Sequence, residues 1–280
     1  MNNPLFPRIG QGTWRLGDEP SLAAAECAAL RRGIKLGATL IDTAEMYGDG
    51  RSEALVGRAL QGVARRDVQI CSKVYPWNAD RAHIFTSCAD SLRRLGTDYL
   101  DLYLLHWPGD VPLVETVACL EELVAQGQIR HWGVSNFDTA DMQALWRVPG
   151  GQHCIINQVL YHLGSRGIEW DLLPWCRAQG VHVMAYSPLA EGGKLRPYGR
   201  NLLSDPLLCR LAEEIGCTVH QLLLAFVLQQ PGVTAIPKSA NATHTESNVR
   251  AADIAVTDAQ WAQIDTVFCP PTSKMHLDIN

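Results

Sequence analysis

The chain has 280 residues, of which 47% are apolar, and carries a formal net charge of −5 from 24 Lys and Arg against 29 Asp and Glu. This length can bury about three quarters of the unfolded surface in one or two domains, and the lack of a basic cluster argues against nucleic-acid binding. Nine cysteines, an odd number without a C-x-x-C pair, indicate reduced thiols rather than disulfides or a zinc site. The N-terminal sequence shows no secretion signal, and the longest apolar run, 222–228, is too short to span a membrane, so we expect a soluble cytoplasmic protein.

Apolar strand-like segments alternate along the chain with segments of helical spacing. In the first half, strands are expected at 9–14, 39–41, 68–72 and 99–105, and helices at 21–34, 51–60, 84–95 and 113–124. Ser21 is expected to cap the first helix, and Gly96 and Gly127 to end the third and fourth. In the second half, strands are expected at 129–134, 154–159, 181–186 and 233–236, and helices around 142–145, 171–179, 207–230 (one or two), 242–249 and 258–267. The Gly- and Pro-rich stretch at 187–206 is expected to be irregular.

Eight apolar strands separated by about eight helices predict a parallel sheet that closes on itself, a (β/α)8 TIM barrel formed as a single domain by residues 1–280. A doubly wound open sheet is the alternative. Its dinucleotide-binding form carries G-x-G-x-x-G after the first strand, but here Gly10-Gln11-Gly12 is followed by Arg15 where the third glycine would stand. The pattern therefore favours the barrel.

Three of the expected strands end in residues with acid–base chemistry. The strand at 39–41 is followed by Asp42 and then by Tyr47, and the next two strands deliver Lys73 and His106. Taken singly, these residues have ordinary structural interpretations: a turn former, a packing tyrosine, a solvated lysine and a core histidine. In a parallel barrel, however, all such strand ends lie on one rim, where active sites are built.

Together the four residues suit the protonation of an oxygen that is becoming an alkoxide. A free tyrosine has a pKa near 10, and an adjacent Lys73 ammonium is expected to lower the pKa of Tyr47. Asp42 would pair with Lys73, and His106 would hydrogen-bond a substrate oxygen. This is the general-acid half of carbonyl reduction. Since no side chain provides a hydride, a nicotinamide cofactor is implied.

Motifs along nearly the whole chain resemble those of the aldo-keto reductase family, and the match is closest to short bacterial members that reduce methylglyoxal and other small aldehydes. The matching segments are Gly10-Gln11-Gly12-Thr13-Trp14, Asp42-Thr43-Ala44-Glu45-Met46-Tyr47-Gly48, Ser72-Lys73, Leu105-His106-Trp107, Gly133-Val134-Ser135-Asn136-Phe137, Asn157-Gln158-Val159, Ala185-Tyr186-Ser187-Pro188-Leu189 and Ile236-Pro237-Lys238-Ser239. The resemblance implies a (β/α)8 barrel that binds NAD(P)H without a Rossmann motif. It also implies a catalytic tetrad of Asp42, Tyr47, Lys73 and His106.

Further residues are candidates for holding the cofactor. Ser135, Asn136 and Gln158 offer the paired donors and acceptors that a carboxamide requires, and Tyr186 is placed to stack on the nicotinamide ring. Lys238 and Ser239 follow the last strand, where barrels commonly hold phosphate. The resemblance adds Gly12, Thr13, Trp14, Asp42, Ser187, Leu189, His244 and Asn248 as cofactor-binding residues.

The sequence departs from the family where the cofactor's 2′-phosphate is recognised. The family often has arginine at the position of His244 and glutamate at that of Ser247. Arginine grips a phosphate with a permanent charge, whereas histidine is only partly charged at pH 7. Lys238 and Ser239 favour NADPH, and NADH remains open.

Trp14, Trp77 and Trp107 flank the rim motifs and, with Tyr47 and His106, are expected to bind substrate. We therefore expect a monomeric NADPH-dependent reductase of aldehydes and ketones, including 2-oxoaldehydes such as methylglyoxal and aromatic aldehydes. Two alternatives stay open: a regulatory module that binds NADPH with little turnover, and a sugar-phosphate isomerase, which would not need Ser135, Asn136 and Gln158. No H-E-x-x-H motif or Cys/His spacing indicates a metal site, and none is expected.

Overall fold

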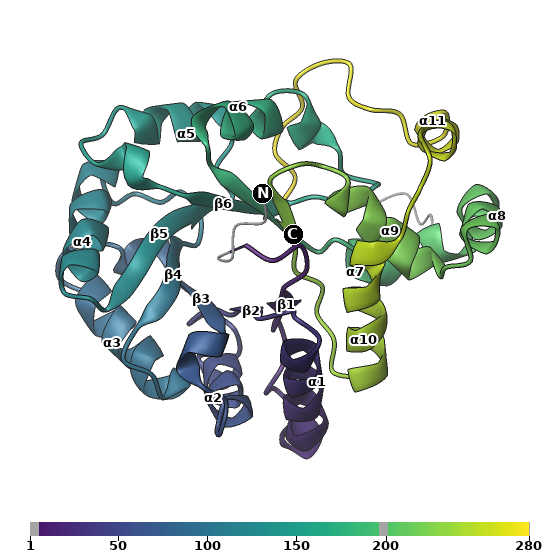
Figure 1. Ribbon diagram of the computed structural model, residues 1–280. Coiled ribbons are helices and arrows are strands. Elements are labelled where there is room, and N and C mark those ends of the chain that lie inside the picture. The colour runs from purple at the N-terminus through teal and green to yellow at the C-terminus, as the bar shows by residue number, and fades with distance from the viewer. Residues whose placement is uncertain (1–5, 196–200, 280) are drawn as a thin grey trace.

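The computed structural model describes residues 6–195 and 201–279. Its strands are β1 (Gln11–Gly12), β2 (Leu40–Asp42), β3 (Gln69–Val74), β4 (Leu100–Leu105), β5 (Ile129–Ser135), β6 (Ile156–Leu160), β7 (His182–Tyr186) and β8 (Val233–Ala235). Its helices are α1 (Ala23–Lys35), α2 (Arg51–Ala59), α3 (Ile84–Leu95), α4 (Leu113–Ala125), α5 (Thr139–Trp146), α6 (Leu172–Gln179), α7 (Ala190–Gly193), α8 (Pro206–Ile215), α9 (Val219–Leu228), α10 (Ala242–Arg250) and α11 (Asp258–Asp265). The strands curl around a central axis and the helices surround them (Figure 1).

The sheet is parallel and its strands pair in sequence order from β1 to β8. The two ends of the sheet then meet, because the Gly10 amide donates to the Ala235 carbonyl at 2.9 Å and bridges join Ile9 to Ala235 and Gly12 to Lys238. The expected (β/α)8 barrel is therefore confirmed, and the open-sheet alternative is wrong.

The helix ends show which local signals were informative. Gly96 takes a left-handed conformation (φ 66°) directly after α3, as does Gly180 (φ 75°) after α6, so each ends its helix as glycine commonly does. The prediction for Ser21 was wrong. It lies inside a 3-10 helix, Pro20–Leu22, that precedes α1, and the residue before α1 is Leu22 without a side-chain cap. The irregular connection at 187–206 holds the four-residue α7 and a 3-10 turn at Leu202–Ser204, and residues 196–200 lie outside the described part.

Successive residues of each strand face opposite sides, so the barrel has two apolar layers. One buried cluster fills the interior and consists of Leu40, Cys71, Leu102, Leu104, Ile156, Met184 and Ile236. The alternate residues, such as Tyr103 and Leu105 of β4, belong to a larger cluster between the sheet and the helices. The interior is thus a packed core and not a channel.

The segment after α11 arches over α6 toward the barrel axis (Figure 1). Lys274 Nζ holds it by ion pairs to Asp138 Oδ1 at 2.5 Å and to Asp171 Oδ1 at 2.9 Å. Asp138 and Asp171 directly precede α5 and α6, so the tail is fixed at the rim formed by the carboxyl ends of β5 and β6.

Among the described residues no single helix is long and apolar enough to cross a membrane. Helices α8 and α9 reach the required length and hydropathy only as a pair bent by 86°, and buried core helices of other proteins can do the same.

Candidate active site

The candidate site is the last layer of the barrel interior at the carboxyl ends of the strands. Inward-facing apolar residues are each followed, two positions later, by a polar or aromatic residue of the same strand parity. The pairs are Leu40 and Asp42, Cys71 and Lys73, Leu104 and His106, Ile156 and Gln158, and Met184 and Tyr186. Five strands therefore deliver functional side chains into one space, as the strand ends predicted.

Lys73 is the centre of this layer. Its side chain is completely buried, and Nζ donates to Asp42 Oδ2 at 2.9 Å, to the Thr43 carbonyl at 2.8 Å and to the Tyr47 hydroxyl at 3.0 Å. An ammonium has three protons, so these three acceptors satisfy it fully. Gln158 Nε2 donates to the other Asp42 oxygen at 2.7 Å. The Lys73 charge is therefore paired and held against the tyrosine.

The environment sets the protonation states of this group. Burial alone would lower the pKa of Lys73, but the Asp42 carboxylate and Tyr47 raise it above its ordinary value of 10.5. Burial raises the pKa of Tyr47 to about 12, with Lys73 acting to lower it and Asp42 to raise it. The lowering effect expected from Lys73 is present, but burial outweighs it. Tyr47 is accordingly a protonated phenol at neutral pH, beside a charged lysine.

His106 completes the four residues. It is 8% exposed, and its ring centroid lies 5.8 Å from that of Tyr47. Burial, with a smaller contribution from the Lys73 charge, lowers the pKa of His106 to about 2, so the ring is neutral at working pH. The ring nitrogen Nδ1 is buried without a hydrogen-bond partner. A neutral imidazole offers one donor and one acceptor, which suits a carbonyl oxygen better than a second charge would.

The amide-rich group at the ends of β5 and β6 is internally organised. Asn136, in a left-handed conformation (φ 60°), donates from Nδ2 to the His106 carbonyl at 3.1 Å and accepts at Oδ1 from the Tyr186 hydroxyl at 2.9 Å. Ser135 Oγ donates to the Gln158 carbonyl at 2.9 Å. These contacts fix all four residues next to Asp42 and His106. The structure therefore brings together Ser135, Asn136 and Gln158, expected to hold a carboxamide, and Tyr186, expected to stack on the nicotinamide ring.

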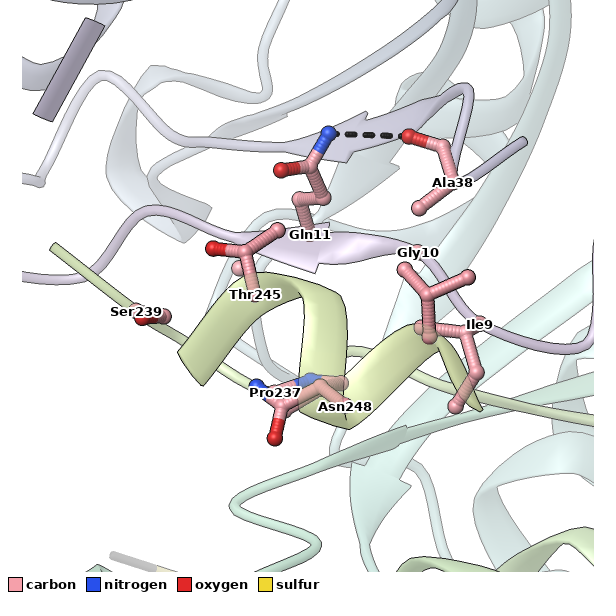
Figure 2. Close-up of a pocket in the computed structure, with 10 residues that line it drawn as sticks. Ile9, Gly10, Gln11, Ala38, Pro237, Ser239, Thr245 and Asn248 are labelled. Carbon is pink, nitrogen blue, oxygen red and sulfur yellow. Dashed lines mark hydrogen bonds between the residues drawn. The ribbon is translucent and has the colours of Figure 1, made fainter. Parts of the chain in front are cut away.

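The residues expected to hold phosphate lie around the end of β8 and the start of α10. A small pocket between β1 and α10 is lined by Gly12, Ser239 and Asn248 among others (Figure 2). Lys238 and His244 are exposed. Asn241 caps α10 and its Oδ1 accepts from the amides of Thr243 and His244 at 2.8 and 3.1 Å. Those two amides are thus already paired within the chain.

Two further predicted positions lie after β7. Ser187 takes a left-handed conformation (φ 47°), and Leu189 is half-buried directly before α7.

Thr13 Oγ1, at the end of β1, donates to the Asp42 carbonyl at 2.9 Å, and the buried Ser52 hydroxyl donates to Thr13 Oγ1 at 2.7 Å. Thr13 therefore supports the backbone of the Asp42 loop.

Aromatic rings line the mouth next to Tyr47. Trp14 meets the Tyr47 ring edge-on at 4.9 Å, and Trp107 lies 4.8 Å from the His106 ring and 5.7 Å from Trp77. Tyr75, whose ring stacks on Trp77 at 4.5 Å, was not among the residues expected from the sequence to line this surface. The signal was available, because Tyr75 shares strand parity with Lys73 just beyond the end of β3. The expected aromatic surface is thus a continuous set of rings.

A sequence model described as the Aldo/keto reductase family matches residues 8–268. The chain belongs to this family. It is 53% identical over 274 residues to the methylglyoxal reductase YeaE of Escherichia coli K12, covering 98% of this chain and 95% of the relative. It is 34% identical over 270 residues to the glyoxal reductase of Bacillus subtilis, covering 95% of this chain and 90% of the relative.

Solved structures agree with the family assignment. An aldo/keto reductase from Klebsiella pneumoniae, solved in complex with NADP and acetate, superposes with a TM-score of 0.95 at 53% identity, covering 98% of this chain and 96% of that one. An aldo-keto reductase from the same organism was solved in complex with NADPH, with a TM-score of 0.95, 53% identity and 98% and 95% coverage. This aldo/keto reductase is therefore an oxidoreductase, as the sequence predicted.

Proposed function

We propose that this aldo/keto reductase reduces aldehydes and ketones to alcohols with NADPH, and that Tyr47 is the general acid. The observation that carries the proposal is the buried chain from Asp42 through Lys73 to the Tyr47 hydroxyl, with distances of 2.9 and 3.0 Å. A protonated phenol, a paired ammonium and a neutral imidazole at one end of a barrel match the needs of an oxygen that gains negative charge.

Each of the four residues has a defined task. Tyr47 donates its phenolic proton to the carbonyl oxygen, and the adjacent Lys73 charge stabilises the tyrosinate that this leaves. Asp42 pairs with Lys73 and holds it in place, while Gln158 fixes the carboxylate through its second oxygen. His106 orients the carbonyl oxygen as a neutral hydrogen-bonding partner. NADPH, when bound, supplies the hydride that no side chain can provide.

The chemistry of the polar groups beside the tetrad fits a nicotinamide cofactor. Ser135, Asn136 and Gln158 present a hydroxyl and two amides from adjacent strand ends, which complement the donors and acceptors of a carboxamide. Tyr186 is fixed by its bond to Asn136 and offers a ring face beside them. We assign these four residues to the nicotinamide. The remaining cofactor contacts near the rim are assigned to Gly12, Thr13, Trp14, Ser187 and Leu189. The adenosine phosphate end is assigned to Lys238, Ser239, His244 and Asn248.

NADPH is the proposed cofactor over NADH for a structural reason. Lys238 and Ser239 follow β8 and precede α10, and the exposed Lys238 ammonium offers a positive charge to a 2′-phosphate. His244 stands near them as a first-turn residue of α10, where arginine would add a permanent charge. The preference for NADPH is therefore expected to be moderate.

The substrates we propose are 2-oxoaldehydes such as methylglyoxal and aromatic aldehydes. The first class rests on 53% identity to a protein named methylglyoxal reductase. The second rests on the rings of Trp14, Trp77 and Trp107 beside Tyr47 and His106, which offer an apolar and aromatic surface for a ring-bearing substrate. We also propose that the 280 residues act as a single domain, as a cytoplasmic monomer.

The experiment that tests this proposal is the consumption of NADPH and NADH by purified protein with methylglyoxal and with an aromatic aldehyde, alongside the affinity for NADPH in the absence of substrate. Turnover with NADPH favoured over NADH supports the reductase. Tight NADPH binding without turnover of either aldehyde refutes it and supports a regulatory module.

A further inference from the structure

Glu45 lies between Asp42 and Tyr47 but has no contact with the tetrad that would give it a part in proton transfer. Its Oε1 atom accepts a hydrogen bond from the Tyr75 amide at 2.7 Å and from Asn78 Nδ2 at 3.2 Å. Its own amide donates to the Lys73 carbonyl at 3.4 Å. Glu45 therefore ties the loop that carries Tyr47 to the segment that follows β3.

The segment held by Glu45 carries the aromatic surface of the mouth. It forms a 3-10 helix, Pro76–Asn78, for which Tyr75 is the capping residue without a side-chain cap of its own. The rings of Tyr75, Trp77 and Trp107 lie within 4.5 to 5.9 Å of one another as a three-ring cluster, which we call the aromatic wall. The two hydrogen bonds that hold this segment, from the Tyr75 amide and from Asn78 Nδ2, are both accepted by Glu45 Oε1.

The aromatic wall continues directly into the reactive group. The Trp107 ring lies 4.8 Å from His106, and the His106 ring lies 5.8 Å from Tyr47. A ring-bearing aldehyde whose carbonyl sits between Tyr47 and His106 would place its ring against this wall. A small carbonyl compound would reach Tyr47 and His106 without needing the wall.

The environment of Glu45 supports a holding function. Burial raises the pKa of Glu45, while the hydrogen bonds from Tyr75 and Asn78 act to lower it. A partly buried carboxylate that faces one backbone amide and one side-chain amide has the contacts of an anchor. Acceptance of these bonds needs an oxygen atom and does not need a charge, so a glutamine at this position can keep them.

We propose that Glu45 is a positioning residue that fixes the aromatic wall and thereby sets the affinity for aromatic aldehydes, with little influence on small carbonyl substrates. The proposal rests on the proposed reductase function. It adds a specificity determinant that acts through Tyr75 and Asn78 rather than by contact with substrate.

The test compares Glu45→Ala and Glu45→Gln with wild type, using 4-nitrobenzaldehyde and methylglyoxal as substrates. Loss of the anchor in Glu45→Ala should raise KM for the aromatic aldehyde by about fivefold to tenfold, the value of one or two hydrogen bonds. KM for methylglyoxal and kcat for both substrates should change less than about twofold. Glu45→Gln should behave as wild type. An equal effect on both substrates, or no effect of Glu45→Ala on either, would overturn the proposal.

A matched control addresses charge. Asp49 lies on the same loop with a 90% exposed side chain, and it also contributes negative charge near Tyr75. Asp49→Asn removes that charge without touching the anchor, and asparagine tolerates the left-handed backbone found there (φ 51°). A rise in aromatic KM for Asp49→Asn equal to that for Glu45→Ala would show that charge, not anchoring, is responsible, and would overturn the proposal.

Two further readouts separate this proposal from the proposed function. In a Trp77→Ala background, Glu45→Ala should no longer raise the aromatic KM, since the wall is already broken; an undiminished increase contradicts the proposal. Near-ultraviolet circular dichroism reports the stacked rings without turnover, and its aromatic bands should change in Glu45→Ala but not in Glu45→Gln. If wild type reduces neither aldehyde, the proposed function fails. The circular dichroism spectrum still tests Glu45 in that case, because unchanged aromatic bands in Glu45→Ala would overturn its assignment as a positioning residue.

Discussion

Replacement of Lys73 by methionine is the perturbation that the structure constrains most closely. The change keeps an unbranched side chain of similar length and removes the ammonium that bonds Asp42, Thr43 and Tyr47. Asp42 is 2% exposed, and Gln158 Nε2 would remain as a neutral side-chain donor to its carboxylate. Removal of one partner from a buried ion pair costs roughly 3–5 kcal/mol, because the remaining charge is left unpaired out of water.

The assay is urea unfolding at pH 7 for wild type, Lys73→Met, Asp42→Asn and the double variant. The pairing with Asp42 and Tyr47 raises the pKa of Lys73 above its unfolded value of 10.5. Its stabilising contribution is therefore fully present at pH 7 and declines only when the pH rises above that value. Lys73→Met should lower the free energy of unfolding by roughly 3–5 kcal/mol, and Asp42→Asn should restore much of this loss in the double variant.

The result that refutes this reasoning is a loss of less than about 1 kcal/mol for Lys73→Met with no coupling to Asp42→Asn. That value is typical of an exposed pair, and it would mean that water reaches Asp42 in solution. The expected loss of activity in the same variant follows from the missing stabilisation of the tyrosinate.

Two further predictions concern pH and cofactor choice. Burial raises the pKa of Tyr47 to about 12 and lowers the pKa of His106 to about 2, so kcat for aldehyde reduction should be flat from about pH 6 to 9. Alcohol oxidation needs tyrosinate as a base, so its chemical step, measured by stopped flow, should become about tenfold faster per pH unit. A fall in the reduction rate below about pH 6.5 would contradict the assignment of His106 as a buried neutral histidine. His244→Arg should increase the ratio of kcat/KM for NADPH over NADH by about tenfold or more through a permanent charge on the 2′-phosphate, and an unchanged ratio would show that position 244 does not face this phosphate.

The fold, and the position of the polar strand-end residues on one rim, were predictable because both depend on a local pattern. Strand parity and the common rim of a parallel barrel are enough to bring Asp42, Lys73 and His106 together, and glycines such as Gly96 mark helix ends through their own conformational freedom. Ser21 shows the limit of such signals, since a preceding Pro20 started a 3-10 helix that displaced the expected cap.

Features that depend on three-dimensional packing were beyond the sequence pattern. Burial decides that the pKa of Tyr47 shifts upward, although Lys73 acts to lower it. How deeply a side chain is buried under neighbouring loops depends on the whole fold. The sequence gives no sign of a separate function for Glu45, because its partners Tyr75 and Asn78 lie on another loop some thirty residues away. Its role becomes visible only when the two loops are seen side by side.

The central claim is that Tyr47 donates the proton, and Tyr47→Phe tests it most directly because it removes one hydroxyl and keeps the ring beside Trp14 and His106. NADPH affinity, followed by quenching of protein fluorescence, should stay within about twofold of wild type, while kcat for methylglyoxal should fall by about 10²–10⁴. A variant that binds NADPH normally and retains more than about a tenth of wild-type kcat would contradict the account, because a different group would then be the proton donor.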